Sequence, residues 1–507
     1  MRSGQPRAAS RRMGVAMSSL PPAMATTRVR ARRGPHRSMR QRSASKVAIV
    51  AAAAVCATFF TRTGPAGAGT HAAVGGRAAT ATATGAWGTA EEVPGLAALN
   101  KGGYAAITSV SCASPGNCSA GGYYTGGTGK TQAFAVDETG GTWGTPKEVA
   151  AALNKGGDGE ILSVSCASPG NCSAGGYYAN GRNNRLAFAM DETGGTWGTP
   201  KQVAAALNKG GGAQISSVSC ASAGNCGAGG YYAGPAGTQH AFVVSEANGT
   251  WGTAAKVTGT TMPDVRLISA VTSVSCPSAG NCSAGGEAPN YSAPSWDQAF
   301  VAGETNGVWG TAEEPPGVTA PNQAGINTLS CASAGNCSAG GVYETQSTPG
   351  PVNQAFVVDE TDGTLGTAQE VAVAVNKGGD AAINSLSCAS AGNCSVAGFY
   401  AAAGFTDQAL VANEAGGTWG TAGEVPGTAQ LDTDGDAQTE SVSCASAGNC
   451  SAGGYYTDAA GWHVFVVNEV NGRWGAAEQV PGTAQPTADA AAGGKNPSVS
   501  RAHSAGS

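Results

Sequence analysis

Residues 109–122 read SVSCASPGNCSAGG, and near copies of this stretch return six more times along the chain. Five residues separate the two cysteines of each copy, and the first cysteines of successive copies are 54, 54, 56, 55, 57 and 56 residues apart. A period of this length is the signature of a repeat architecture, in which one supersecondary unit cannot bury its apolar face alone. The sequence therefore predicts seven copies of one structural unit.

Each unit contains four short strand candidates joined by turns. In the second unit they cover residues 161–166, 172–178, 186–192 and 196–203. Four strands within about 55 residues, with no room for a helical crossover between them, are typical of an antiparallel meander. Glycine supplies 79 of the 507 residues and charged side chains only 12%, which also favours short strands and turns over long helices.

The turn between the third and fourth strands has the clearest signal. The dipeptide before the Trp-Gly step is GG in units 1, 2 and 6, NG in units 3, 4 and 7, and DG in unit 5. These dipeptides supply the two positive-φ residues of a type I′ hairpin turn. Glycine fills the second place in every unit, at Gly141, Gly195, Gly249, Gly307, Gly363, Gly417 and Gly472.

One four-stranded meander exposes two apolar faces, and seven arranged radially can cover each other. The predicted fold is therefore all-β, a seven-bladed β-propeller of four-stranded antiparallel blades over residues 84–482. We expect tryptophans to pack between neighbouring blades, with Leu365 replacing the tryptophan in unit 5 and giving the least well packed blade. The tryptophans are Trp143, Trp197, Trp251, Trp309, Trp419 and Trp474.

The sequence offers one outer strand too many for closing the ring. TGAWGTAEEV at residues 84–93 precedes unit 1, and NGRWGAAEQV at residues 471–480 ends unit 7. Propellers often close by borrowing an outer strand from the opposite terminus, which the N-terminal copy can supply. The C-terminal copy has its own hairpin turn and can pair locally. The sequence leaves open which copy is displaced.

At this point the repeat resembles the secreted propellers of the Asp-box, or BNR and sialidase-like, superfamily, whose turn reads S-x-D-x-G-x-T-W. Aligned on Trp143, this chain has Val136, Glu138, Gly140 and Thr142 where the family has Ser, Asp, Gly and Thr. The serine is lost and Glu replaces Asp in all seven units. The resemblance is to a propeller with a degenerate Asp-box turn.

The paired cysteines admit three interpretations. A zinc site needs four converging ligands, and the repeat region contains only His240 and His463 beside the cysteines. A redox centre needs a C-x-x-C-like spacing in one special unit, not seven equal ones. Paired cysteines around a tight turn in an exported chain favour a hairpin disulfide in each blade. The predicted pairs are Cys112 and Cys118, Cys166 and Cys172, Cys220 and Cys226, Cys276 and Cys282, Cys331 and Cys337, Cys388 and Cys394, and Cys444 and Cys450.

Export itself is predicted from the N-terminus. Residues 1–68 contain 13 of the 28 basic residues and no acidic residue, and include a 14-residue apolar run after Lys46, followed by small residues suited to cleavage. This is a secretory signal with a long basic n-region, too short in its apolar run to stay as a membrane helix, so we expect no integral membrane segment after cleavage. Met39 would give a more usual start, and Cys56 would leave with the signal.

The remaining chain is predicted to be an extracellular, monomeric protein that does not bind nucleic acid. After residue 68 it holds 15 basic against 33 acidic side chains, which leaves no basic stripe to displace phosphate counterions. Residues 69–83 are expected to be a linker and residues 483–507 a disordered tail, since they lack apolar periodicity.

The BNR resemblance implies a possible sialidase-type enzyme, with three arginines on the substrate carboxylate, a Tyr and Glu pair as nucleophile and an Asp as acid/base. The units supply few arginines, and the carboxylates of Glu160 and Glu440 belong to different units, although paired carboxylates at a catalytic separation stay open. A polysaccharide-active glycoside hydrolase or lyase is therefore the alternative to a non-catalytic role. The arginines are Arg182, Arg185, Arg266 and Arg473.

Loop variation points to a binding role. The cysteine and hairpin turns are nearly constant and emerge on one side of a meander, whereas the two-to-three connections on the other side vary most, as expected of a recognition surface on a repeated scaffold. The alternative is that these loops simply tolerate change. We expect this face to bind a carbohydrate, a cell-envelope polymer or a protein partner. The candidate contacts are Tyr124, Tyr178, Arg182, Arg185, Tyr232, His240, Tyr291, Trp296, Phe405 and Trp462.

One between-blade loop is acidic. In unit 7 it reads LDTDGDAQTE, which places Asp432, Asp434 and Asp436 at alternate positions with Glu440 beyond. Alternating carboxylates suit a hard cation such as Ca²⁺, although the glycine is misplaced for an EF-hand, and a solvated acidic turn is the other interpretation. No other cofactor is expected. The corresponding LNKGG and VNKGG loops are interpreted as turns at Asn100, Asn154, Asn208 and Asn376.

Overall fold

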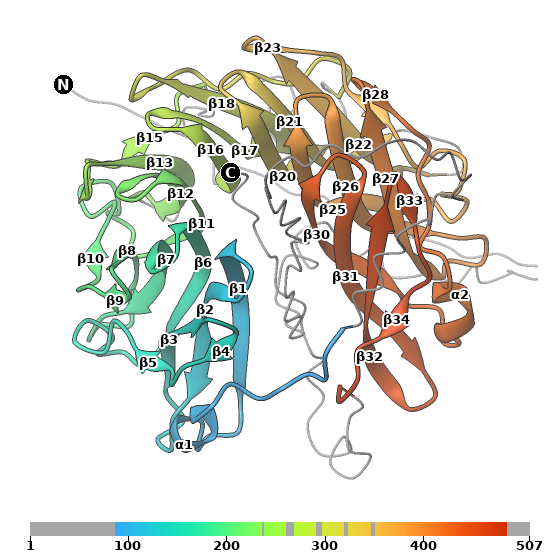
Figure 1. Ribbon diagram of the computed structural model, residues 1–507. Coiled ribbons are helices and arrows are strands. Elements are labelled where there is room, and N and C mark those ends of the chain that lie inside the picture. Colours follow the sequence, from blue (N-terminus) through green and yellow to red (C-terminus); the bar gives the residue numbers. More distant parts are fainter. Residues whose placement is uncertain are drawn as a thin grey trace, which may run out of the picture. The chain divides into compact units, whose positions relative to one another are not determined.

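The computed structural model describes residues 87–235, 238–259, 268–289, 297–318, 323–345 and 350–483. The predicted signal segment, the linker and the tail beyond residue 483 lie outside these ranges, as do Tyr291 and Trp296. Within the described ranges, no helix has the length and apolar character needed to cross a bilayer. The described chain folds as seven antiparallel sheets, one for each repeat (Figure 1).

The three long strands of each blade pair in chain order, which confirms the predicted meander. In blades 1 to 4 they are β1 (Ala105–Ser114), β2 (Asn117–Thr125) and β3 (Thr131–Thr139); β6 (Gly159–Ser168), β7 (Asn171–Ala179) and β8 (Arg185–Thr193); β11 (Ala213–Ser222), β12 (Asn225–Ala233) and β13 (Gln239–Ala247); β16 (Ala270–Ser278), β17 (Asn281–Pro289) and β18 (Asp297–Thr305). In blades 5 to 7 they are β20 (Ala324–Ser333), β21 (Asn336–Thr345) and β22 (Val352–Thr361); β25 (Ala381–Ser390), β26 (Asn393–Ala401) and β27 (Asp407–Ala415); β30 (Gln438–Ser446), β31 (Asn449–Asp458) and β32 (Gly461–Val470).

The fourth, outermost strand is broken in two, where the sequence predicted one continuous run. In blade 2 Trp197 pairs with Glu192 and Lys201 with Ala189, both on β8, and the backbone bends between them at Gly198. The first halves are β4 (Thr142–Trp143), β9 (Thr196–Trp197), β14 (Thr250–Trp251), β19 (Val308–Trp309), β23 (Thr364–Leu365), β28 (Thr418–Trp419) and β33 (Arg473–Trp474). The second halves are β5 (Lys147–Glu148), β10 (Lys201–Gln202), β15 (Ala255–Lys256), β24 (Gln369–Glu370), β29 (Gly423–Glu424) and β34 (Glu478–Gln479), and in blade 4 a single bridge from Glu313 to Val301 takes their place.

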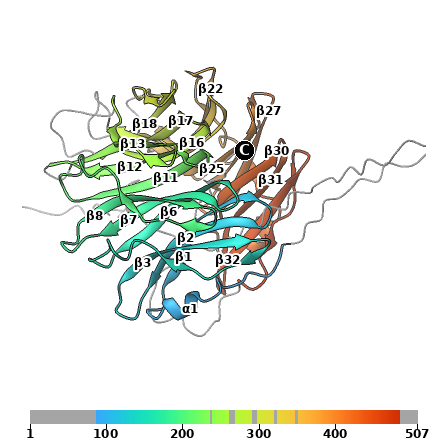
Figure 2. The same ribbon diagram turned by 60° about the vertical axis from the view of Figure 1, so that its left-hand side comes forward.

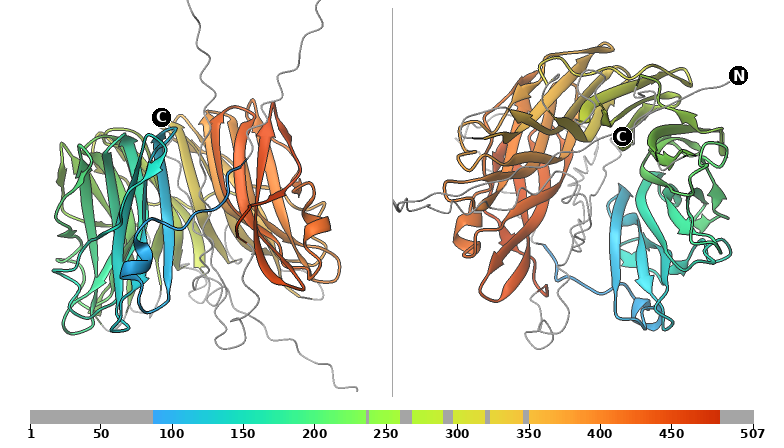
Figure 3. Two further views of the ribbon diagram at one scale, coloured as in Figure 1. Left: turned by 60° about the horizontal axis from the view of Figure 1, so that its bottom comes forward. Right: turned by 180° about the vertical axis from the view of Figure 1, so that it is seen from behind.

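The innermost strands lie side by side in chain order, from β1 through β6, β11, β16, β20 and β25 to β30 (Figure 2). Serine hydroxyls join them: Ser163 Oγ accepts the backbone N–H of Val218 at 2.9 Å, and Ser165 Oγ accepts that of Cys220 at 2.9 Å. The same pair of bonds recurs at each of the five other junctions between successive blades. Seven four-stranded blades arranged in this way confirm the predicted β-propeller (Figure 3).

The cysteine turn and the hairpin turn of each blade lie on the same rim, which we call the cysteine rim. The two turns are joined by a backbone hydrogen bond. Gly141 N–H donates to Gly116 O at 2.9 Å, and a Cβ at Gly116 would approach Gly141 N to 2.7 Å. The hairpin residues have positive φ, for example 50° at Asn248 and 75° at Gly249, as a type I′ turn requires. All seven predicted cysteine pairs are at bonding distance, with S–S separations of 2.02–2.11 Å.

Five of the six tryptophans pack between neighbouring blades as predicted, whereas Trp143 joins a cluster of blade 1 with Leu96 of the preceding segment. Trp197 is 9% exposed and belongs to an apolar cluster that joins Ala133 and Ala135 of blade 1 to Ile161 and Phe188 of blade 2. Close approach across this junction also needs glycine, because a Cβ at Gly121 would come within 2.5 Å of Ile161 Cγ2. Blades 2 to 7 each bury an apolar face against the preceding blade, and blade 1 buries its own against residues 93–99.

The described ends of the chain answer the question of the extra strand. The C-terminal copy pairs locally, since β33 and β34 both pair with β32. The N-terminal copy reaches both terminal blades: Ala90 N–H donates to Pro481 O at 2.8 Å, and Gly95 lies against Thr145 of blade 1. The short helix α1 (Leu96–Leu99) then packs on blade 1, and Figure 1 traces this segment in blue from beside β34. The other short helix, α2 (Thr428–Leu431), precedes blade 7.

Candidate functional site

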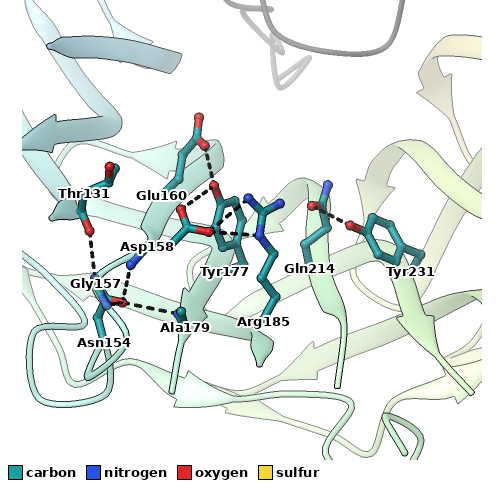
Figure 4. A network of polar contacts seen from close by, with 10 residues as sticks. All are labelled: Thr131, Asn154, Gly157, Asp158, Glu160, Tyr177, Ala179, Arg185, Gln214 and Tyr231. Atoms are coloured by element: carbon teal, nitrogen blue, oxygen red, sulfur yellow. Dashed lines mark hydrogen bonds and ion pairs between the residues drawn. The ribbon is translucent and has the colours of Figure 1, made fainter. Parts of the chain in front are cut away.

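A network of polar side chains lies on the rim opposite the cysteine turns, which we call the variable rim (Figure 4). Tyr177, near the end of β7, donates its hydroxyl to Glu160 Oε2 at 3.0 Å and lies 3.3 Å from Asp158 Oδ1. Arg185, the first residue of β8, binds Asp158 Oδ2 through Nε at 3.1 Å and Nη2 at 3.0 Å. Its guanidinium carbon also lies 4.0 Å from the centre of the Tyr177 ring.

This environment changes the acid–base properties of two groups. Burial raises the pKa of Glu160 to about 7, although the hydrogen bond from Tyr177 and the charge of Arg185 oppose the shift. Burial and the nearby carboxylates also raise the pKa of Tyr177. The Glu160 carboxyl therefore changes charge near neutral pH, while the Tyr177 phenol stays protonated.

The loop that presents Asp158 is held by Asn154, which is 5% exposed. Its Oδ1 accepts the backbone N–H groups of Gly157, Asp158 and Ala179 at 3.2, 3.0 and 3.3 Å. Its Nδ2 donates to Thr131 O of blade 1 at 2.9 Å. The LNKGG loop is thus a turn, as expected, and it also fixes a site residue relative to the neighbouring blade.

The same strand position carries tyrosine in the blades on either side. Tyr123 of blade 1 has its pKa raised by burial and by the charge of Glu160, and Tyr231 of blade 3 donates to Gln214 Oε1 at 3.1 Å. Figure 4 shows Tyr231 and Gln214 beside Arg185, and both tyrosines are half-buried. We call Tyr123, Glu160, Tyr177, Arg185, Gln214 and Tyr231 the tyrosine site.

The remaining blades depart from this pattern. Blades 4, 5 and 6 have Glu287, Val342 and Phe399 at the position of Tyr177. Blade 7 again has a tyrosine, Tyr455, which donates to Asp436 Oδ1 at 3.2 Å and contacts the Trp462 ring at a centroid distance of 4.5 Å. Three consecutive tyrosines therefore distinguish blades 1 to 3 from the others.

Three of the residues predicted as ligand contacts are the second members of Tyr-Tyr pairs and lie in apolar cores. Tyr178 and Tyr232 lie between blades, and Tyr124 lies between blade 1 and the segment that contains Leu96. Tyr124, Tyr178 and Tyr232 are 4%, 3% and 6% exposed. The hydroxyl of Tyr124 donates to Glu148 Oε2 at 2.7 Å, and the Tyr232 ring contacts the His240 ring at a centroid distance of 5.2 Å and an interplanar angle of 39°.

The other predicted contacts are spread along the variable rim. Arg185 belongs to the tyrosine site, and Arg182 is exposed in the loop before it. Phe405 of blade 6 is 82% exposed with a φ of 66°, and His240 bonds Thr238 Oγ1 at 2.9 Å. Arg185 joins the carboxylate of Asp158 and the ring of Tyr177, whereas His240 contacts Thr238 and the Tyr232 ring.

The acidic loop of unit 7 has the same construction as the Asn154 loop. Asp432 Oδ1 accepts the backbone N–H groups of Gly435 and Asp436 at 3.1 Å each, and that of Thr457 at 3.3 Å. Among the described residues, no group of three or more His, Cys, Asp or Glu side chains converges as a metal site. The Ca²⁺ site at Asp432, Asp434, Asp436 and Glu440 stays a prediction.

Sequence reasoning missed Tyr123, Tyr177, Tyr231 and Gln214, although a signal was present. Alternation along β7 puts Tyr178 on the face of Cys172 and Ala174, and Tyr177 on the opposite face. Across the seven units the Tyr178 position is tyrosine six times, whereas the Tyr177 position varies. The constant position serves the core and the varying one serves the rim.

This chain resembles known proteins in structure but not in sequence. No protein-family model and no curated protein matches the chain. Solved structures that resemble it include puromycin hydrolase in an S511A complex (11% identity, TM-score 0.45, 80% of this chain and 57% of that chain). A PL25 ulvan lyase is similar at 10% identity and a TM-score of 0.41, over 70% of this chain and 88% of that chain. A flat-faced bat subtype N11 neuraminidase-like protein is similar at 13% identity and a TM-score of 0.35, over 72% of this chain and 88% of that chain. This chain thus spans little more than half of the hydrolase.

Proposed function

We propose that this protein is an extracellular, non-catalytic binding protein that recognises a saccharide through the tyrosine site. The observation that carries the proposal is the placement of Tyr123, Tyr177 and Tyr231 at one strand position in three consecutive blades. Tyr123 and Tyr231 are half-buried and can offer their rings, whereas Tyr177 is 5% exposed and supports the guanidinium of Arg185. Tyrosine rings combine an apolar face with a polar tip, which suits ligands that have both, such as sugar rings. Seven disulfides fit an oxidising compartment outside the cell.

The polar partners favour a ligand rich in hydroxyl groups. Glu160 and Gln214 offer oxygen acceptors, and Arg185 offers guanidinium donors in a fixed orientation set by Asp158. These groups are held by hydrogen bonds before a ligand arrives, so little conformational entropy is lost on binding. Asp158 balances the charge of Arg185, and Glu160 adds a negative charge above about pH 7, which favours a neutral saccharide over a polyanion.

A glycan array probed with the full, disulfide-bonded chain tests this proposal. We expect a set of neutral glycans to bind and Arg185→Ala to weaken binding to all of them. Phe405→Ala, on the same rim in blade 6, is the matched control and should leave binding unchanged. Capture of a cell-envelope protein with no binding to any glycan would replace the saccharide by a protein partner, and loss of binding only in the Phe405 variant would move the site to blade 6.

A polysaccharide-active enzyme is the second candidate, because the Glu160 carboxyl has a pKa of about 7 and is bonded to a tyrosine. A carboxylic acid that is protonated near neutral pH is suited to general acid catalysis. Release of reducing or unsaturated ends from a bound glycan, abolished in Glu160→Gln, would establish catalysis. Binding without any cleavage by the unaltered chain would leave the non-catalytic role.

A further inference from the structure

The junction between blades 4 and 5 lacks a hydrogen-bonded tryptophan–aspartate pair that joins other neighbouring blades. The indole N–H of Trp251 donates to Asp191 of blade 2 at 3.0 Å, and Trp197 and Trp419 donate in the same way to Asp137 and Asp359. At the junction of blades 4 and 5 the tryptophan is replaced by Leu365 and the acceptor by Gly303. Donor and acceptor are therefore lost together, which leaves no unpaired partner behind.

Their loss opens a cavity of about 750 Å³ on the cysteine rim. Leu365 and Val301 give it an apolar wall, and Gly303 faces open space, since a Cβ there would meet nothing within 4 Å. Four carboxyl groups border the cavity, those of Glu304, Glu313, Glu360 and Asp362, and Glu304 is 4% exposed. Lys and Arg are absent from the described residues that line it.

Serine hydroxyls, and no Lys or Arg among the described lining residues, partner the carboxyl groups of this cavity; Ser245 Oγ donates to Glu304 Oε1 at 2.5 Å. Ser283 Oγ donates to Glu360 Oε2 at 3.4 Å, a long hydrogen bond. Burial and the charge of Glu313 raise the pKa of Glu360. A cation placed here would relieve the repulsion between the two carboxylates and gain from the partly desolvated surroundings.

We propose that this cavity binds a small ligand that carries an aromatic ring and a cationic amine. The space left by the missing indole and the apolar wall of Leu365 fit the ring, and the four carboxyl groups fit the amine by charge complementarity. The site lies on the opposite rim from the tyrosine site and shares no residue with it. The inference therefore does not depend on the proposed saccharide binding.

Three related probes separate ring volume from charge. Tryptamine carries an indole and an ammonium group, 3-methylindole is its neutral counterpart, and indole-3-propionate is its anionic counterpart. Calorimetric titration of the full, oxidised chain should give affinities in the order tryptamine, 3-methylindole, indole-3-propionate. Equal or tighter binding of indole-3-propionate would overturn the proposal.

Two kinds of variant locate the binding. Leu365→Trp restores the indole and should abolish tryptamine binding, whereas Leu365→Ile keeps the cavity and should retain it. Glu360→Gln should weaken tryptamine by about fivefold and leave 3-methylindole unchanged, because only the ion pair is removed. Glu360→Gln also keeps the test decisive should Leu365→Trp unfold. Unchanged tryptamine affinity in either Leu365→Trp or Glu360→Gln would contradict the assignment.

Discussion

The junction between blades 2 and 3 and the junction between blades 4 and 5 use the same strands but differ in what fills them. At the first, Trp251 fills the space and its N–H reaches Asp191. At the second, Leu365 and Gly303 leave a cavity. The serine-to-backbone bonds of the inner strands are kept at both, for example from Val218 N–H to Ser163 and from Leu329 N–H to Ser273. The inner strands therefore hold the ring together, and the outer part of a junction is free to change.

The largest effect should come from emptying the filled junction. Trp251→Ala removes a 9% exposed indole and leaves Asp191 with a lost donor, so we expect a fall in the free energy of unfolding of about 3–5 kcal/mol. Leu365→Ala, at a side chain that already borders a cavity, should cost about 2 kcal/mol. Urea unfolding of the oxidised protein measures both. Equal losses would mean that the two junctions do not differ in packing.

Acid should stabilise the filled junctions. Glu192 is 3% exposed, and burial, with the charge of Asp137, raises its pKa from 4.5 to about 7, while Ser119 and Lys147 oppose the shift. The folded state therefore binds more protons than the unfolded state between these pH values. This contribution is fully present below pH 4.5 and is lost as the pH rises through 7. It amounts to at most about 3 kcal/mol.

Glu192→Gln tests this pH dependence. The variant keeps a neutral side chain of the same shape at every pH, so it should flatten the fall in unfolding free energy between pH 5 and pH 8. Glu138, at the same position in blade 1 and less buried, supplies the control as Glu138→Gln. An unaltered pH profile in Glu192→Gln, with a flatter one in Glu138→Gln, would assign the effect to another group.

The disulfides should contribute less than the tryptophans. Replacing Cys166 and Cys172 together by alanine removes a short loop closure worth about 2 kcal/mol in the chain-entropy model. Cys172 contacts Ser119 of blade 1 and Cys337 contacts Ser283 of blade 4 in the same way, but Cys337 also borders the cavity. The double variant of Cys331 and Cys337 should therefore be the milder of the two in thermal unfolding. A larger loss in blade 5 would contradict the packing difference.

Much of the fold could be predicted from the sequence, because comparing the seven repeats shows which positions the blade structure requires. The spacing of the cysteines gives the number of blades, and the glycines before each Trp-Gly step give the hairpin turns. The break in the outer strand could not be predicted, since it depends on the bond from Gly198 N–H to Asp191 O within the hairpin. The path of residues 87–95 between the terminal blades also depends on long-range contacts.

The candidate site was harder to predict, because it is built from residues that are distant in sequence. Glu160 and Tyr177 meet through the pairing of β6 with β7, and Arg185 comes from a third strand. The sequence of a Tyr-Tyr pair does not show which tyrosine lies in the core, because the two side chains point to opposite faces of the strand. The cavity could be predicted only from Gly303 and Leu365 together, because neither substitution by itself indicates that the tryptophan and its acceptor are both missing at one junction.

The most direct test of the proposed division between the two rims compares glycan binding by one variant on each rim. Affinity for the best glycan from the array would be measured by calorimetry for the unaltered chain, Tyr231→Ala and Leu365→Trp. We predict a loss of about tenfold or more in Tyr231→Ala and no change in Leu365→Trp, because the indole lies on the opposite rim. Unchanged affinity in Tyr231→Ala, with both variants folded, would contradict saccharide recognition at the tyrosine site.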